Sequence, residues 1–199
     1  MLKSLDTIDR TILLWMHGKH NSIFDQLMPF ITNEDNWVIP IFLLIVFLGF
    51  KAGKKGKISL ALLILALALT DSICAQILKP LFERVRPSHL SMDGLNLLVP
   101  KGGKWSMPSN HAANIFSLAV VLSYFYNRMK IPLFVLASLI ALSRVYVGVH
   151  YPSDVIVGGL LGYAIGWFTI TLWVILKIRE LKRRQAWVWY ETEPPVFKN

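Results

Sequence analysis

The chain has 199 residues, of which 54% are hydrophobic and 17% are charged, and its mean hydropathy is +0.50. A soluble domain usually carries about a quarter charged residues, whereas here the apolar residues form long uninterrupted runs. The composition excludes an ordinary soluble domain and predicts one membrane domain, residues 1–199. The net charge of +9 is compatible with nucleic-acid binding. Most Lys and Arg residues lie between apolar runs, however, so we expect a membrane and no nucleic-acid partner.

Residues 1–32 predict amphipathic helices rather than a membrane span. Apolar residues recur there at helical spacing in two groups: Ile8, Ile12 and Trp15, and then Phe24, Leu27, Met28 and Ile31. Charged and polar residues fill the other positions. We predict two short helices that lie in the membrane interface or pack against the helix bundle.

Five apolar segments within residues 37–176 each predict a transmembrane helix. They are Trp37–Phe50, Ile58–Lys79, Ser109–Tyr126, Ile131–Val149 and Pro152–Leu176. The first is short for a bilayer that needs about 20 residues, but the lysines after it can snorkel. The predicted fold class is all-α: an integral membrane helical bundle of about five transmembrane helices, preceded by the N-terminal amphipathic helices.

The basic residues between these spans predict the orientation. They fall at 51–57, at Arg128 and Lys130, and at 177–184 within a basic tail of residues 177–199. Five alternating spans put all three segments on one side, which the positive-inside rule assigns to the cytoplasm. The sequence therefore predicts a multi-pass protein of the inner (cytoplasmic) membrane with its other side facing outward.

Polar residues gather in four stretches on that outward side. The stretches are Lys79–Pro87 (KPLFERVRP), Pro108–His111 (PSNH), Ser143 with Arg144, and His150 with Asp154 in HYPSD. They follow or precede consecutive spans, so we expect the fold to bring them together. Charges near a bilayer core are costly and usually functional, so their convergence predicts a functional site.

The order and spacing of these stretches resemble a known family. The pattern K-x6-R-P, then P-S-N-H, then S-R-x5-H-x3-D, from Lys79 to Asp154, is similar to the three-part signature of the type-2 phosphatidic acid phosphatase superfamily. That family includes membrane lipid phosphatases and soluble vanadium haloperoxidases, and the apolar spans suit the membrane branch. One position differs, because Asn110 stands where the family usually has glycine.

Three cations are placed to hold a phosphate group. Catalysis of phosphoryl transfer is mostly positioning and electrostatic stabilisation, and Lys79, Arg86 and Arg144 can supply positive charge and bidentate contacts. Ser109 is expected to N-cap the next helix and leave free backbone N–H groups that attract an anion. Asn110 either accommodates a left-handed turn or contacts phosphate through its amide.

The resemblance implies that His150 is the nucleophile and forms a phosphohistidine. Asp154 can hold the other ring N–H of His150 and stabilise the cation formed later. His111 is placed to protonate the leaving lipid oxygen and then to activate water. The fixed cations take over the electrostatic work of a metal, so neither a metal nor another cofactor is expected.

Each of these residues also has a structural interpretation. Lys79, Arg86 and Arg144 can anchor helix ends at the interface, while His111 and Asp154 can stabilise helix termini. Further polar residues were assigned outside the site: Arg84 as an anchor or an attractor of substrate, Asp71 as structural support or a partner of a site cation, and His17, His20 and His89 as surface or interfacial residues.

The favoured function is a metal-independent lipid phosphatase that acts on the outward face of the membrane. The resemblance implies lipid A phosphate, undecaprenyl diphosphate, phosphatidylglycerol phosphate or phosphatidic acid as substrates. Two alternatives remain: a phosphotransferase that uses the same phosphohistidine, and a non-catalytic anion-binding membrane protein. No obligatory protein partner is expected.

Overall fold

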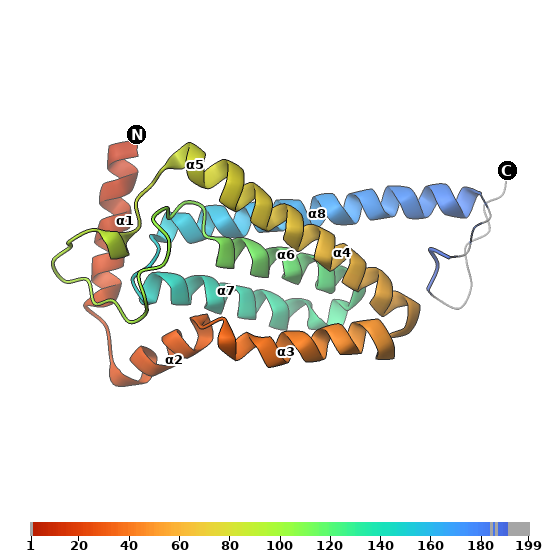
Figure 1. Ribbon diagram of the computed structural model, residues 1–199, viewed down its shortest axis with the longest axis horizontal. Coiled ribbons are helices and arrows are strands. Elements are labelled where there is room, and N and C mark those ends of the chain that lie inside the picture. The colour runs from red at the N-terminus through yellow and green to blue at the C-terminus, as the bar shows by residue number, and fades with distance from the viewer. Residues whose placement is uncertain (1, 184, 186, 191–199) are drawn as a thin grey trace.

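The computed structural model describes residues 2–183, 185 and 187–190, and helices dominate this part of the chain (Figure 1). The helices are α1 (Leu2–His17), α2 (Ser22–Thr32), α3 (Asp35–Val46), α4 (Gly53–Ser72), α5 (Lys79–Phe82), α6 (Asn110–Phe125), α7 (Lys130–Tyr146) and α8 (Pro152–Lys182). Short π-helical turns, Phe47–Lys51 and Ile73–Leu78, extend α3 and α4, and 3-10 turns form at Pro87–His89 and Asn127–Met129. The predicted all-α fold is confirmed.

Three helical segments are long and apolar enough to cross a membrane. They are Gly53–Phe82, Asn127–Tyr146 and Pro152–Lys182. A fourth unit is the pair Ser22–Thr32 and Asp35–Lys51, which meets the same criterion across a 49° bend. The helix α2, expected to lie in the interface or to pack against the bundle, packs against α7 and is joined to α3 as half of a bent pair. The remaining predicted span corresponds to α6, which has 16 residues and packs against α4, α7 and α8.

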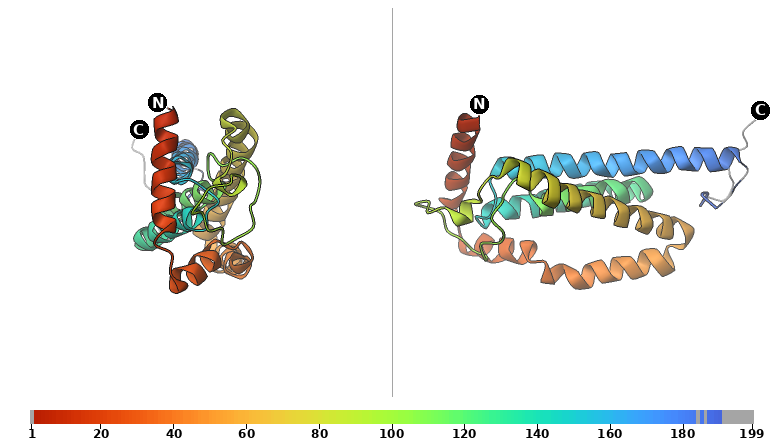
Figure 2. Two further views of the ribbon diagram at one scale, coloured as in Figure 1. Left: turned by 90° about the vertical axis from the view of Figure 1, so that its left-hand side faces the viewer. Right: turned by 45° about the horizontal axis from the view of Figure 1, so that its top comes forward.

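Figures 1 and 2 show which connections lie at each of the two ends of the bundle. The α3–α4 connection, the α6–α7 connection and the end of α8 lie at one end. The loop of residues 83–109, the α7–α8 turn and the start of α6 lie at the other end, where α1 runs crosswise to the bundle. The basic residues of 177–182 continue α8 rather than forming a separate tail, and part of the predicted tail lies outside the described residues.

Small residues let α6 and α8 approach closely. A side chain added at Gly162 of α8 would overlap the carbonyl of Ala113 on α6, and one at Gly158 would meet the backbone of Ser109. Small residues at helix contacts are how membrane helices gain packing without a hydrophobic driving force. This contact sets the start of α6 against the start of α8, which is where the site residues lie.

Replacement of Gly162 by alanine is expected to force α6 and α8 apart. Overpacking of this kind costs roughly 1–3 kcal/mol, so the melting temperature of Gly162→Ala in detergent is expected to fall. Gly103→Ala is the matched control, because a Cβ at Gly103 meets no described atom within 4 Å. Equal melting temperatures for the two variants would contradict the close contact.

Candidate active site

The loop between α5 and α6 holds Arg86 in a fixed position. Its backbone N–H donates to the carbonyl of Lys104 at 3.0 Å, and its Nε donates to the carbonyl of Trp105 at 3.1 Å. An isolated antiparallel bridge joins Val85 to Trp105 beside it. Arg86 is 8% exposed. Lys79 opens α5 directly after a π-helical turn, and its charge interacts with those of Arg86 and Arg144.

The anion seat predicted from the sequence would lie at the start of α6. Ser109 is the N-cap residue, as expected, and its backbone N–H donates to the carbonyl of Asp154 at 3.0 Å. Its hydroxyl does not cap the helix: it is buried and has no hydrogen-bond partner among the described residues. Burial of an unpartnered hydroxyl is unfavourable, so this group is available to a ligand.

Asp71 supports the adjacent residue of α6. The side-chain amide of Asn110 donates to Asp71 at 2.7 Å, and that of Asn114 does so at 3.5 Å. Structural support by Asp71, the favoured interpretation, agrees with these bonds, whereas Arg144 bonds elsewhere. The Asn110 amide nitrogen is engaged by Asp71, and contact between Asn110 and phosphate stays a prediction.

The bend between α2 and α3 contacts two of the predicted site residues. Nη1 of Arg144 donates to the hydroxyl of Thr32 at 2.6 Å, and Nε2 of His111 lies 3.0 Å from a carboxylate oxygen of Glu34. Thr32 and Arg144 are buried, at 4% and 9% exposure. The side chain of Glu34 is 81% exposed, so the His111 pair sits at the mouth of the site. Neither Thr32 nor Glu34 was singled out from the sequence.

His150 and Asp154 form the buried centre of the site. Nδ1 of His150 lies 3.4 Å from Oδ2 of Asp154, and the two side chains are 1% and 0% exposed. The same Oδ2 accepts the backbone N–H of Tyr151 at 2.8 Å. With its N–H on Nδ1, the neutral imidazole keeps the lone pair on Nε2, which is the arrangement that a nucleophile requires.

The electrostatic surroundings keep His150 neutral. Burial lowers the pKa of His150 to about 4; Asp154 raises it, and the charges of Arg86 and Arg144 lower it further. His111 interacts electrostatically with Arg144, His150, Arg86 and Lys79, so residues from all four stretches lie near one another. The predicted convergence of the four stretches agrees with this geometry, while the catalytic roles stay predictions.

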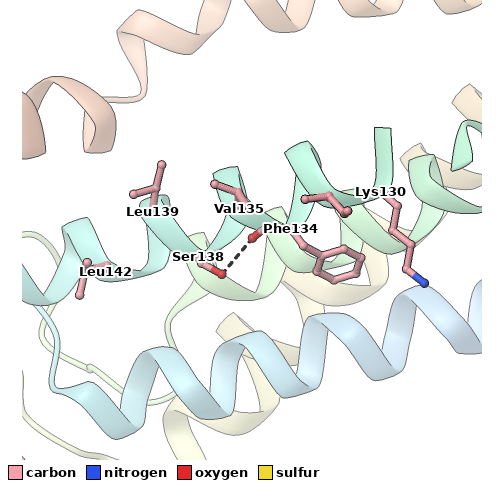
Figure 3. Close-up of a pocket in the computed structure, with 7 residues that line it drawn as sticks. Lys130, Phe134, Val135, Ser138, Leu139 and Leu142 are labelled. Carbon is pink, nitrogen blue, oxygen red and sulfur yellow. Dashed lines mark hydrogen bonds between the residues drawn. The ribbon is translucent and has the colours of Figure 1, made fainter. Parts of the chain in front are cut away.

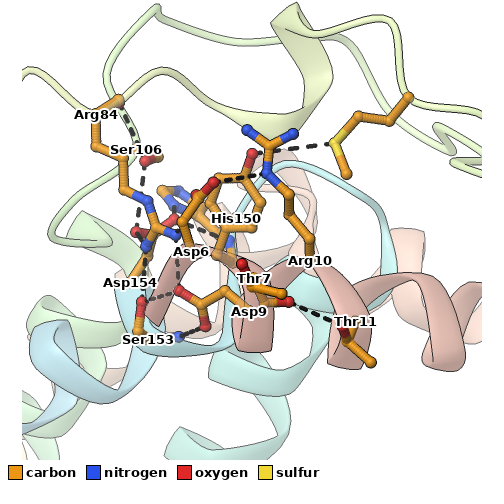
Figure 4. Close-up of polar contacts among 12 residues, drawn as sticks. Asp6, Thr7, Asp9, Arg10, Thr11, Arg84, Ser106, His150, Ser153 and Asp154 are labelled. Atoms are coloured by element: carbon orange, nitrogen blue, oxygen red, sulfur yellow. Dashed lines mark hydrogen bonds and ion pairs between the residues drawn. The ribbon is translucent and has the colours of Figure 1, made fainter. Parts of the chain in front are cut away.

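Arg84 is not an interfacial anchor, and that expectation was wrong. Its guanidinium donates to Asp154 at 2.9 Å, to Asp9 of α1 at 2.7 Å and to the hydroxyl of Ser153 at 2.7 Å (Figure 4). Three acceptors draw the side chain inward, where it is 16% exposed. Arg84 lies in the interior because it pairs with buried carboxylates. The sequence around Arg84 does not show that these partners exist.

His17 was expected to be a surface or interfacial residue, but it is buried, at 5% exposure. Its Nδ1 accepts the backbone N–H of Asn96 at 3.1 Å, and its Nε2 lies 3.4 Å from the carbonyl of Val145. These backbone partners allow burial of the polar ring between the end of α1 and the loop. His89 is exposed, as expected.

A separate apolar groove of about 500 Å³ runs along the outside of α7 from Lys130 to Leu142 (Figure 3). Every residue that lines it belongs to α7, and its walls are apolar side chains such as Val135 and Leu139. The polar site lies beyond its end, around Arg144. In a membrane, such a face contacts lipid chains. The polar site is therefore the better candidate for the active site.

Comparison with known proteins points to one family. The PAP2 superfamily matches residues 59–177. The lipid A 4'-phosphatase of Bacteroides thetaiotaomicron is 32% identical over 177 residues, which cover 84% of this chain and 77% of that protein. The lipid A 4'-phosphatase of Porphyromonas gingivalis is 29% identical over 87% of this chain and 76% of its own length. The crystal structure of Aquifex aeolicus LpxE superposes with a TM-score of 0.67 at 29% identity, over 81% of this chain and 93% of that one.

The low pKa of His150 predicts a loss of stability in acid. The unfolded chain binds a proton on His150 near pH 6.5, whereas the folded protein does so only near pH 4. The free energy of unfolding therefore falls as the pH drops from 6.5 towards 4, by on the order of 2 kcal/mol at pH 5. We expect His150→Gln to lose less thermal stability than the unmodified protein between pH 7.5 and pH 5. Parallel losses in the two proteins would mean that His150 is protonated in the folded state.

Proposed function

The chain belongs to the PAP2 superfamily and is a membrane lipid phosphatase, and from this premise we propose that it removes head-group phosphate through a phosphohistidine formed on His150. The observation that carries the proposal is the buried, neutral imidazole of His150, with Nδ1 facing Asp154 and two arginines close by. A neutral imidazole surrounded by fixed positive charge suits attack on an anion, because the charges stabilise the phosphoryl group without protonating the nucleophile.

In the first step the Nε2 lone pair attacks phosphorus, and the bond from phosphorus to the lipid oxygen breaks. Lys79, Arg86 and Arg144 hold the negative charge of the phosphoryl oxygens. The Ser109 hydroxyl and the backbone N–H groups at the start of α6, including that of Asn110, complete the seat for the phosphate. Asp154 stabilises the positive charge that develops on the His150 ring.

His111 is the proton carrier of the proposed reaction. It donates a proton to the departing lipid oxygen, which becomes an alcohol. It then removes a proton from a water molecule as that water attacks the phosphohistidine, so that inorganic phosphate leaves and both histidines return to their starting states. Its buried Nε2 lies 3.0 Å from the carboxylate of Glu34, which is 81% exposed and can connect His111 to solvent water.

Lipid A bearing a 4'-phosphate is the proposed substrate. Two relatives that match more than four fifths of this chain carry the name lipid A 4'-phosphatase. A phosphate monoester on a sugar at the membrane surface presents the dianion that three fixed cations attract. Undecaprenyl diphosphate, phosphatidylglycerol phosphate and phosphatidic acid carry the same anionic group, so we expect them to be hydrolysed as well.

We propose that the site faces outward from the inner membrane. The basic connections lie at the opposite end of the bundle, where the positive-inside rule assigns the cytoplasm. The crosswise helix α1 is proposed to lie in the outer interface. It exposes an apolar stripe of Leu5, Ile8, Ile12 and Trp15, which are 40–65% exposed.

Removal of the nucleophile tests the reaction. Purified His150→Ala is expected to release phosphate from lipid A, undecaprenyl diphosphate and phosphatidic acid at least roughly 10³-fold more slowly than the unmodified protein, with chelator present throughout. The exposed His89 supplies the control, since His89→Ala should stay within about twofold. Near-normal turnover by His150→Ala would refute the mechanism, and phosphate recovered on an alcohol acceptor would favour phosphotransfer.

Removal of the proton carrier is expected to have an effect that depends on the leaving group. A lipid alkoxide leaves poorly without a proton, whereas a phosphate leaving group needs less help. His111→Ala should therefore slow hydrolysis of phosphatidic acid more than hydrolysis of undecaprenyl diphosphate, measured as kcat on each. Equal losses on the two substrates would argue against the role of His111 as an acid.

A further inference from the structure

Asp9 of α1 lies beside the His150–Asp154 pair although it belongs to none of the sequence stretches that form the site. It is 2% exposed, in a helix whose neighbouring carboxylate, Asp6, is 40% exposed. Its Oδ1 accepts the backbone N–H of Ser153 at 2.9 Å, and its Oδ2 accepts both the Ser153 hydroxyl and Nη2 of Arg84. Burial of an ionised carboxylate is costly, so the full set of partners around Asp9 indicates that its negative charge has a role in this structure.

Arg84 connects Asp9 to the pair (Figure 4). Nη2 of Arg84 is 2.7 Å from Asp9, and Nη1 is 2.9 Å from Oδ1 of Asp154. The guanidinium also lies over the ring of Tyr151, 4.1 Å from its centroid. A planar guanidinium held through both Nη groups and one face has little freedom to rotate.

Each oxygen of Asp154 consequently has its own task. Oδ1 accepts from Arg84 at 2.9 Å and lies 3.4 Å from the Ser106 hydroxyl. Oδ2 is left for the backbone N–H of Tyr151 and for Nδ1 of His150. If Arg84 turned away, the carboxylate could rotate, and the direction of the Nδ1 contact would change with it.

We propose that Asp9 is a positioning residue for the nucleophile: through Arg84 it fixes the Asp154 carboxylate, and thereby the tautomer and ring orientation of His150. The proposal rests on the proposed role of His150 as the nucleophile. It also links α1 to catalysis, because α1 supplies Asp9, the first residue in the series of contacts from Asp9 through Arg84 and Asp154 to His150.

The sign of the electrostatic effect follows from the same contacts. Arg84 neutralises part of the negative charge of Asp154, and that charge favours protonated His150. The charged or titratable groups that face His150 come from each neighbouring segment: Asp154, Arg86, Arg144 and His111. Among the charged groups that the structure describes, Arg84 is the cation paired with Asp154, so its removal should make His150 easier to protonate.

The first test compares two carboxylates of the same helix. In full-length protein purified in detergent, Asp9→Asn is expected to lower kcat for phosphatidic acid by about 10- to 100-fold, because a small misorientation of reacting groups has effects of that size. KM should stay within about twofold, since the phosphate-binding cations are untouched. Asp6 contacts the same Arg84 at 3.3 Å but is 40% exposed, so Asp6→Asn should lower kcat clearly less than Asp9→Asn. Asp93→Asn removes an exposed carboxylate of the 83–109 loop and should retain kcat within about twofold.

The second test uses the pH profile of kcat/KM. A smaller amount of folded protein would lower the rate at every pH but would not shift the profile. Arg84→Gln is expected to move the acidic limb of kcat/KM to higher pH, and Arg84→Lys should restore part of both the rate and the limb. The same substrate is used for all variants, so its own titration cancels. This test also covers the case in which Asp9→Asn does not fold.

Three outcomes decide the proposal. Wild-type kcat in Asp9→Asn, or an unmoved limb in Arg84→Gln, overturns it. A lower melting temperature for Asp9→Asn with unchanged kcat per folded enzyme also overturns it, because Asp9 would then only dock α1. Turnover by His150→Ala in the same assay defeats the proposed mechanism itself, whereas an inactive His150→Ala beside a fully active Asp9→Asn defeats the role of Asp9 alone.

Discussion

The site depends on one buried carboxylate at the start of α8. Asp154 is fully buried, and its oxygens meet Arg84, the Tyr151 backbone N–H and the His150 ring. Its own backbone carbonyl accepts the N–H of Ser109, so the same residue also ties the start of α8 to the start of α6. A charge in this position is stable only if every partner is present. Loop, turn and helix ends must therefore assemble together for the nucleophile to be oriented.

The three cations of the site repel one another, whereas the buried carboxylate of Asp154 is surrounded by partners. Lys79, Arg86 and Arg144 lie close enough for their charges to interact, and all three are removed from bulk water to some degree. Each arginine is held by a neutral group rather than by a carboxylate: Arg86 by the Trp105 carbonyl and Arg144 by the Thr32 hydroxyl. Neutral partners fix the geometry without a direct ion pair, so the positive charge is compensated only partly, by Asp154 for Arg86 and by Glu34 for Arg144. A bound phosphate dianion relieves this repulsion. Substrate binding therefore offsets part of the unfavourable free energy of bringing the cations together.

The placement of the candidate site residues at helix ends could be predicted from the sequence, because helix ends are readable from hydropathy. Lys79, Ser109, Arg144 and Asp154 fall at such ends in the structure. The contacts from α1 and from the α2–α3 bend were not predictable in this way. They depend on the angle at which α1 crosses the bundle and on the 49° bend between α2 and α3. Neither angle can be predicted from a local sequence pattern. One signal existed for Asp9, since Leu13 and His17 follow it at spacings of four residues, and these three share the buried side of α1.

Two histidine–carboxylate pairs of opposite character result from this arrangement. The side chains of His150 and Asp154 are 1% and 0% exposed, whereas those of His111 and Glu34 are 24% and 81% exposed. A nucleophile must keep its lone pair free of bulk protons and hold one direction, and burial achieves both. A group that gives a proton to an alcohol and later takes one from water must exchange protons in every cycle, and the exposed Glu34 carboxylate beside the buried Nε2 of His111 offers a route for that exchange. The difference in burial between the two pairs thus matches the division of labour proposed for them, and it arises because His150 sits between α7 and α8 while His111 faces the break between α2 and α3.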